Sequence, residues 1–165
     1  MNVASSAEVK YENKKTDPLA VVIGVDEYYV GNSGLEVEEG HNFSDFDIQN
    51  NSYVCVIGPD FKKTLLKDVN PLGKSISVRG YKFKVIGILK EQSSSFGNYE
   101  NFQVLIPLGI ARSIFPIDNP NFQLKISAQS KDQLDGLIDD ATIVMRNLRG
   151  LAPLQENYQD RKSVV

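Results

Sequence analysis

The chain has 165 residues and a mass of 18.4 kDa, with 41% hydrophobic and 24% charged residues. This composition is typical of one soluble globular domain and argues against a disordered, collagen-like or disulfide-stapled protein. The net charge of −3 and pI near 5.2 provide no positive field for a phosphate backbone, so we expect no nucleic-acid partner. Cys55, the only cysteine, cannot form an intrachain disulfide, and no apolar run approaches the roughly 18–20 residues that span a bilayer.

The first third of the chain carries strand patterns separated by turns. Residues 3–15 alternate weakly and end in a proline-containing breaker, which predicts one strand and a turn. Residues 19–25 are a continuous β-branched apolar run, as expected for a strand with both faces covered. We expect one helical turn at 26–30, a half-exposed strand at 35–39, and another strand at 53–57.

The middle of the chain contains the clearest hairpin pattern. Residues 41–52 are polar and turn-rich, and 59–67 predict a short amphipathic helix that begins with proline. Residues 75–89 contain two apolar alternations interrupted at Gly80, which predicts a β-hairpin. We expect Gly73, in the turn before it, and Gly80 to adopt positive φ.

The last third ends in the longest predicted element. Residues 91–101 are loop-like, 102–106 predict a strand, and 108–114 predict a short helix. Perfect alternation at 122–126 predicts a further strand. Apolar residues spaced three and four apart over 131–148 predict an amphipathic helix that follows Ser130 and stops at Gly150, with its apolar face packed on a sheet.

One short motif resembles a nucleotide-binding loop. Gly73, Lys74 and Ser75 match the end of the P-loop pattern G-x-x-x-x-G-K-[ST]. Asp68 occupies the position of the first glycine, Pro71 interrupts the loop, and a strand pattern rather than a helix follows Ser75. We therefore interpret the segment as the entry to a hairpin and expect no bound nucleotide.

Other reactive residue types occur singly. His41 is the only histidine and lies in a turn, which favours an exposed or locally bonded side chain over a catalytic base. Cys55 lies between two valines in a strand pattern, which favours a buried, inert thiol. We expect no catalytic set, no metal site and no cofactor.

Acidic and aromatic residues gather near the first strands. The acidic group comprises Glu36, Glu38, Glu39, Asp45 and Asp47. Its spacing does not match a calcium loop, so we expect a solvated strand edge. Tyr28, Tyr29 and Tyr53 could line a binding surface, but aromatics beside strands are more often part of the core or its rim.

Five segments in order carry a family pattern. They are residues 31–43, 53–58, 70–76, 83–89 and 104–108. Together they resemble the extracytoplasmic core domain of MacB/FtsX-type ABC-transporter permeases, in which the pattern reads roughly l-x-x-G-R-x-F, v-x-v-i-G, p-x-G-k-x-i, f-x-V-i-G-v and i-P. The resemblance covers about residues 19–150, and His41 stands where the family usually has arginine. The resemblance implies structural roles for Gly40, Phe43, Gly58, Pro71, Gly73, Lys74, Gly87 and Pro107.

The resemblance implies an α+β fold with two mixed α/β lobes. Residues 28–106 would form a strand-rich insertion lobe, residues 1–27 with 107–150 a membrane-proximal lobe packed by the 131–148 helix, and 151–165 a tail. The family domain normally begins with a further strand and helix, so we expect a soluble segment of a longer chain that continues into membrane helices at both ends.

The resemblance also implies a function. The domain would be non-catalytic, would lie on the periplasmic face of the inner membrane, and would relay motion of the membrane helices to cargo or to an adaptor protein, in efflux or in lipoprotein or peptide export. ATP hydrolysis would belong to a separate domain or subunit, and the permease would be a dimer. The first alternative is a free-standing ligand- or peptide-binding module. The second, ranked below it, is an enzyme that uses His41 or carboxylate pairs.

Overall fold

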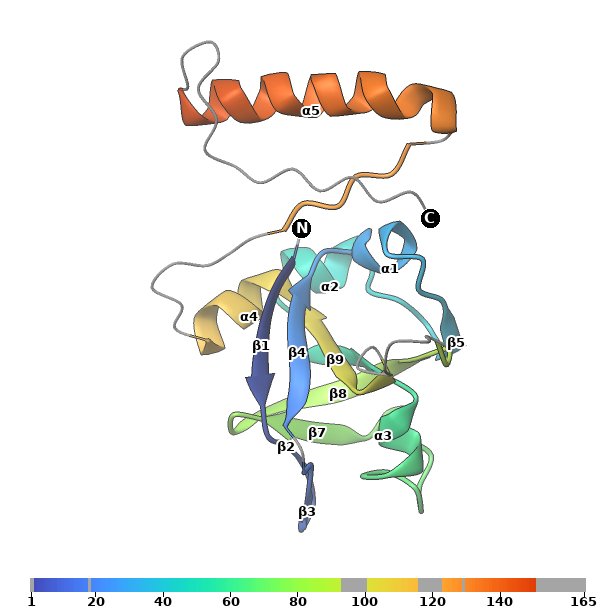
Figure 1. Ribbon diagram of the computed structural model, residues 1–165. Coiled ribbons are helices and arrows are strands. Elements are labelled where there is room, and N and C mark those ends of the chain that lie inside the picture. The colour runs from blue at the N-terminus through green and yellow to red at the C-terminus, as the bar shows by residue number, and fades with distance from the viewer. Residues whose placement is uncertain (1, 18, 93–100, 116–122, 129, 151–165) are drawn as a thin grey trace. The chain divides into compact units, whose positions relative to one another are not determined.

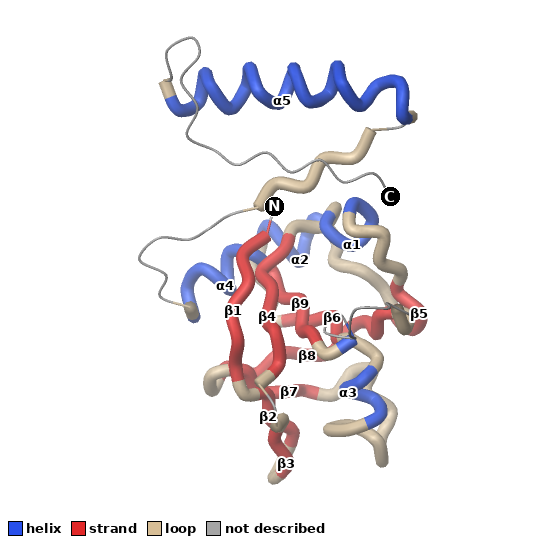
Figure 2. Tube along the Cα trace, in the orientation of Figure 1, coloured by secondary structure: helices blue, strands red, loops and turns tan. Residues whose placement is uncertain are grey.

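The computed structural model describes residues 2–17, 19–92, 101–115, 123–128 and 130–150 (Figures 1 and 2). The chain divides into two compact units, Met1–Lys125 and Ile126–Val165, and each is described by itself. The strands of the first unit are β1 (Asn2–Ala7), β2 (Val9–Tyr11), β3 (Lys14–Lys15), β4 (Ala20–Val25), β5 (Val37–Gly40), β6 (Val54–Ile57), β7 (Ser75–Val78), β8 (Tyr81–Leu89) and β9 (Gln103–Pro107). Its helices are α1 (Tyr29–Asn32), α2 (Asp45–Gln49), α3 (Asp60–Lys63) and α4 (Leu108–Ile114).

All nine strands belong to one mixed sheet, which confirms the expected α+β class. The strand order is β1-β4-β9-β6-β8-β7-β2-β3, and β5 pairs with β8 beside this path. The β4–β9 and β6–β8 pairs are parallel and the others are antiparallel. Only Glu8 separates β1 from β2, yet these strands lie near opposite ends of the strand order. The sheet therefore curls, and the continuous β1–β2 segment joins its two sides (Figure 1).

The central strands bury both of their faces, and this explains their continuous apolar sequences. Along β9, Val104 and Ile106 belong to one core cluster, whereas Leu105 belongs to the other. Neighbouring β6 alternates in the same way. Helices α3 and α4 contribute side chains to the first cluster, and α1 contributes Tyr29 and Val30 to the second. The strands expected at 19–25, 53–57 and 102–106 are confirmed.

The predicted hairpin is formed by β7 and β8. Arg79 and Gly80 connect the strands with φ angles of 50° and 88°, so both turn residues have the positive φ of a type I′ turn. Gly73 has a φ of 77°, which confirms the expectation for both glycines. Ile76 and Phe83 form a directly opposed pair whose side chains are fully buried.

Helix α2 lies within a segment that the sequence indicated only as polar and turn-rich. Ser44 and Asp47 form a capping box: the Ser44 hydroxyl accepts from the Asp47 amide, and the Asp47 carboxylate accepts from the Ser44 amide. Burial raises the pKa of Asp47, but the hydrogen bonds from Ser44, the nearby His41 and a hydrogen bond from Ser52 together leave this pKa below its usual value. None of its residues is fully buried, and Ile48 alone among the residues of α2 packs against the second core cluster, so the sequence shows no helical repeat of apolar residues there.

Two strand predictions need correction. Residues 3–15 form three short strands rather than one strand and a turn, because the chain bends at Glu8 and reverses after Tyr11. The strand expected at 122–126 is wrong over its described part: Gln123 makes an isolated bridge and residues 124–128 have no regular structure. Alternation alone does not make a strand where no neighbouring strand supplies hydrogen bonds.

The second unit contains the long helix that the sequence predicts. A short 3-10 turn at Lys131–Gln133 leads into α5 (Leu134–Arg149), and Gly150 ends it with a left-handed φ of 60°. No helix in the described part of the chain combines the length and apolar character that crossing a membrane requires. The lobe boundaries and the packing of α5 on a sheet stay predictions.

Candidate functional site

The residues that the sequence singled out for chemistry make structural contacts. Lys74 precedes β7, its amide donates to Pro71 O at 3.1 Å, and its carbonyl accepts from Val85 N at 2.8 Å, so it enters a hairpin rather than a helix. Cys55 is fully buried in β6, and burial raises the pKa of its thiol. The His41 ring is exposed, with Nδ1 2.8 Å from the carbonyl oxygen of Asn42. Among the described residues, no group of three or more His, Cys, Asp or Glu side chains is placed to hold a metal ion.

The three tyrosines divide between the core and its rim. Tyr29 is buried in the core cluster beneath α1, whereas Tyr28 is 64% exposed. Tyr53 is about half exposed and stacks on Tyr81, with ring centroids 6.1 Å apart. Phe83 extends this stack into the core, its ring centroid 5.4 Å from that of Tyr53.

Two glycines of the family pattern lie opposite each other where β5 pairs with β8. Gly40 and Gly87 are direct partners in this antiparallel pair. A side chain on Gly40 would collide with the Ile86 carbonyl, and one on Gly87 would place its Cβ 2.5 Å from the His41 carbonyl oxygen. Gly40 also has a φ of 80°. Only glycine permits this close backbone approach, so the first and fourth family segments form one junction.

The third family segment packs against the same junction. A Cβ on Gly40 would lie 2.9 Å from a methyl group of Leu72, which follows the buried Pro71. The Gly73 amide donates to the Val85 carbonyl at 2.8 Å and joins this turn to β8. Phe43, 5% exposed, fills the core cluster on the neighbouring face.

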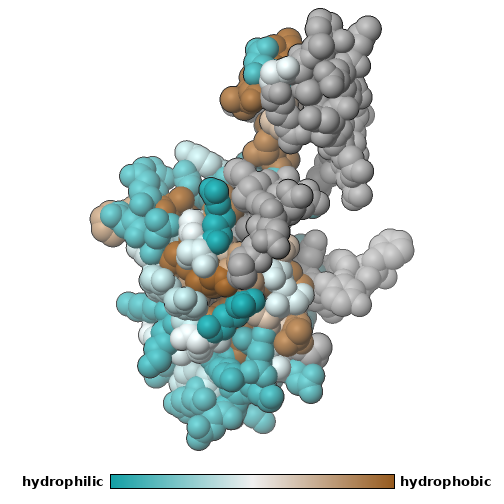
Figure 3. Space-filling view, turned by 90° about the vertical axis from the view of Figure 1, so that its left-hand side faces the viewer, coloured by the Kyte–Doolittle hydropathy of each residue, from teal (hydrophilic) through white to brown (hydrophobic). Residues whose placement is uncertain are grey.

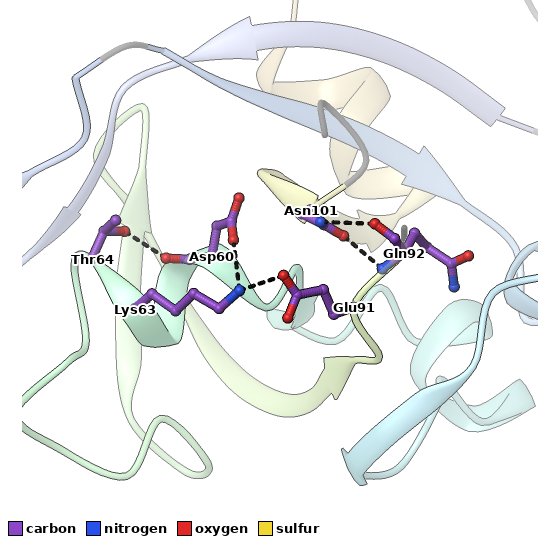
Figure 4. A network of polar contacts seen from close by, with 6 residues as sticks. All are labelled: Asp60, Lys63, Thr64, Glu91, Gln92 and Asn101. Carbon is purple, nitrogen blue, oxygen red and sulfur yellow. Dashed lines mark hydrogen bonds and ion pairs between the residues drawn. The ribbon is translucent and has the colours of Figure 1, made fainter. Parts of the chain in front are cut away.

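The second family segment ends at another close approach. A side chain on Gly58 would collide with the carbonyl of Asn101, and the Gly58 amide donates to Gln103 O at 2.8 Å. Asn101 is completely buried, and its amide group bonds both backbone groups of Gln92, at 2.9 and 3.1 Å (Figure 4). Asn101 thus joins the two described ends of the chain on either side of residues 93–100.

Pro107 connects β9 to α4. It is buried, occupies the N-cap position of α4, and is the last residue of β9 in the parallel pairing with β4, opposite Val25. Gly109, in the first turn of α4, lies so close to the Asn51 side chain that a Cβ would collide with it. Asn51 itself has a φ of 48°. The sequence analysis missed Asn51, Asn101 and Gly109. Of these, Asn51 alone has a local signal, which is an asparagine in a turn.

Ion pairs tie α3 to β5 and to the end of β8. Lys63 Nζ lies 2.6 Å from Glu91 and 3.5 Å from Asp60 (Figure 4), and Lys62 pairs with Glu39. Lys90 bonds Glu36 at 2.6 Å; this hydrogen bond lowers the pKa of Glu36. Two of the acids expected at a solvated strand edge therefore have cationic partners, although they stay accessible to water.

The model of the MacB-like periplasmic core domain matches residues 1–143 of the chain. The macrolide export ATP-binding/permease protein MacB of Neisseria gonorrhoeae is 35% identical over 104 residues, which are 63% of this chain and 16% of that protein. The uncharacterized ABC transporter permease YknZ of Bacillus subtilis is 24% identical over 159 residues, 96% of this chain and 38% of that protein. The chain thus spans about a sixth of the length of this MacB relative.

Two solved structures share the fold. The periplasmic region of MacB from Actinobacillus actinomycetemcomitans aligns with a TM-score of 0.72 at 22% identity, covering 91% of this chain and 66% of that one. The extracellular domain of the ABC-type transporter YknZ from Gram-positive bacteria aligns with a TM-score of 0.73 at 21% identity, covering 92% of this chain and 75% of that one. These likenesses confirm the mixed α/β fold.

Proposed function

Because the chain belongs to the family of MacB-like periplasmic core domains, we propose that it is the extracytoplasmic domain of an ABC-transporter permease. In this proposal the domain relays motion of membrane helices to cargo or to an adaptor protein, in efflux or in lipoprotein or peptide export. It is not an enzyme: a separate nucleotide-binding domain or subunit hydrolyses ATP. The permease is a dimer in the inner membrane, and this domain lies on its periplasmic side.

The observation that carries the proposal is the glycine junction between β5 and β8. Gly40 and Gly87 bring two backbones closer than any side chain allows, and the turn at Leu72 packs on the same point. Backbone contacts of this kind leave little room for strands to slide, because the packed atoms have no alternative rotamers. A domain braced in this way is suited to moving as a rigid body.

The proposed architecture keeps the lobes that the resemblance implies. Residues 28–106 project from the membrane, residues 1–27 with 107–150 form the membrane-proximal lobe, and 151–165 form a tail. In this arrangement β1 starts at the membrane-proximal end and leads away from it. The partner would contact the segment 91–101. The other expected contact, 41–52, lies at the end of the sheet where β1 starts, because the Asn42 side-chain amide donates to Glu27 O and Asn51 contacts Gly109 (Figure 1).

The test uses the complete permease with its ATPase, reconstituted in membranes. Gly87→Ala should loosen the junction, so transport per ATP hydrolysed should fall while ATP hydrolysis continues. Gly31→Ala is the matched control, because a Cβ there meets no atom within 4 Å. Protease resistance of both variants checks that the domain stays folded. Equal transport per ATP in both variants would contradict the relay. Separately, a gene without flanking apolar stretches of about 20 residues would indicate the free-standing module instead.

A further inference from the structure

One face of the sheet carries a row of lysines, although the chain as a whole is acidic. The pairings Lys82↔Ser77, Ser77↔Lys10 and Lys10↔Lys15 align four residues across β8, β7, β2 and β3. Directly opposed residues project from the same face of a sheet. Lys84, paired with Ser75, lies two residues further along β8 and therefore on the same face.

Burial separates this face from the core. Lys10, Lys15, Lys82 and Lys84 are exposed, whereas Val9, Ile76, Val78, Phe83 and Val85, on the opposite face of β2, β7 and β8, are buried. In β3 both Lys14 and Lys15 are exposed. The four strands span roughly 14 Å at the usual spacing between neighbours. We call Lys10, Lys15, Lys82, Lys84, Ser75 and Ser77 the lysine face. Figure 3 shows mostly hydrophilic residues at the lower end of the first unit, where Figure 1 places β2 and β3.

The charge of this face is only partly compensated. Glu8 bridges Lys10 and Lys15 at 3.0 Å each, and both hydrogen bonds lower the pKa of Glu8. No ion pair is recorded for Lys82 or Lys84 within the described ranges. Glu8 offsets the repulsion between the directly opposed Lys10 and Lys15. Lys82 and Lys84 lie opposite serines and two residues apart on β8, so their charges are not compensated by the described residues.

We propose that the lysine face docks a carboxylate-rich segment of a water-soluble protein partner. The face is a plain sheet surface of point charges without arginine forks, which suits several carboxylates on a chain better than one phosphate group. This inference rests on the proposed function for the position of the membrane, which it takes to lie beside the start of β1. The β2–β3 hairpin then lies away from the membrane, although the proposed lobe boundary includes it in residues 1–27. The six residues of β1 separate Asn2 from the β2–β3 hairpin by about 20 Å, more than twice the Debye length of roughly 8 Å in physiological salt. Lipid headgroups beside the start of β1 are therefore screened from this face.

The experiment measures binding of fluorescein-labelled poly-L-glutamate to the 165-residue chain by anisotropy, at low and at physiological ionic strength. Lys82→Gln with Lys84→Gln should weaken binding about fivefold or more, since two uncompensated charges are lost. The matched control, Lys67→Gln with Lys74→Gln, removes the same charge from exposed positions outside the face that also have no ion pair among the described residues, and it should change binding less than twofold.

A third variant reverses the expected sign. Glu8→Gln removes the acid that bridges Lys10 and Lys15, so it should tighten binding while lowering the melting temperature. Equal affinities of the two double lysine variants for poly-L-glutamate would overturn the proposal. No binding by the parent chain at low salt would also overturn it. Tighter binding to phosphatidylglycerol vesicles through the same lysines would replace the protein partner with a membrane. Displacement by millimolar inorganic phosphate would reduce the face to a general anion site, which also overturns the proposal. None of these outcomes affects the permease assay, so failure of the lysine face is distinguishable from failure of the proposed function.

Discussion

Alanine substitutions at Gly73, Gly87 and Gly40 give a quantitative prediction for the free energy of unfolding. They separate the cost of a side chain at positive φ from the cost of a Cβ that overlaps neighbouring atoms. Gly73 has a positive φ of 77° and open space around it, so Gly73→Ala should lose only the conformational cost, about 1–2 kcal/mol. Gly87 has no positive φ, but a Cβ would lie 2.5 Å from the His41 carbonyl oxygen. Gly87→Ala should therefore lose about 1–3 kcal/mol through overpacking.

Gly40 combines both costs. It has a φ of 80°, and a Cβ would collide with the Ile86 carbonyl and lie 3.0 Å from Gly87 Cα. Because both atoms belong to the backbone, the strands must separate to admit a methyl group. Gly40→Ala should thus lose about 2–5 kcal/mol, the sum of the two ranges.

The assay is urea unfolding followed by circular dichroism, with free energies from linear extrapolation at equal slopes. Gly31→Ala is the control: it lies within α1, has open space and no positive φ, and should be neutral or stabilising by up to about 1 kcal/mol. The reasoning is refuted if Gly40→Ala loses no more than Gly73→Ala. It is also refuted if Gly87→Ala is as harmless as the control.

Three further predictions concern separate parts of the chain. Asn101→Ala should cost about 2–3 kcal/mol in urea unfolding, because it leaves the backbone groups of Gln92 unpaired. An unchanged midpoint would show that the two hydrogen bonds between Asn101 and Gln92 do not stabilise the fold. The Asp47 carboxylate, whose pKa lies below its usual value, should stabilise the chain at neutral pH and lose this contribution as the pH falls below about 4. Asp47→Asn should therefore melt below the parent at pH 7 and together with it at strongly acidic pH, and a constant difference would argue against the capping box. If α5 packs its apolar face on a sheet, Leu137→Ala should cost about 1–4 kcal/mol in thermal melts and Asp139→Ala little, whereas equal losses would show the wrong orientation.

The sequence predicts best those elements whose hydrophobic pattern reflects burial. Strands β4, β6 and β9 are apolar throughout because both faces are covered, so composition alone indicates them. Helix α5 is predicted for the complementary reason, since its apolar residues recur at helical spacing up to Gly150. In both cases the sequence pattern follows directly from which faces of the element are expected to be buried.

Elements and residues whose role depends on distant neighbours are predicted poorly. Helix α2 depends on the capping box between Ser44 and Asp47, a signal that polar turn-rich composition conceals. The alternation at 122–126 lacks a recorded pairing partner beyond the bridge at Gln123. Asn101 matters because the fold brings it beside Gly58 and Gln92, which no spacing along the chain reveals. The family pattern recovered the glycines but not the asparagines that they pack against.

The bend at Glu8 has a consequence for the order in which the protein folds. Strand β1 meets β4 after a short reversal, whereas Val9 in β2 pairs with Val78, on a strand that is made much later. Closing a loop of that length costs roughly 4 kcal/mol of chain entropy before any contact repays it. During synthesis the residues of β2 must wait for the β7–β8 hairpin, so the curled sheet is completed only after more than half of the 165 residues have left the ribosome tunnel. The residues of β2 are thus among the last of the first unit to pair, although they precede most of it in the sequence.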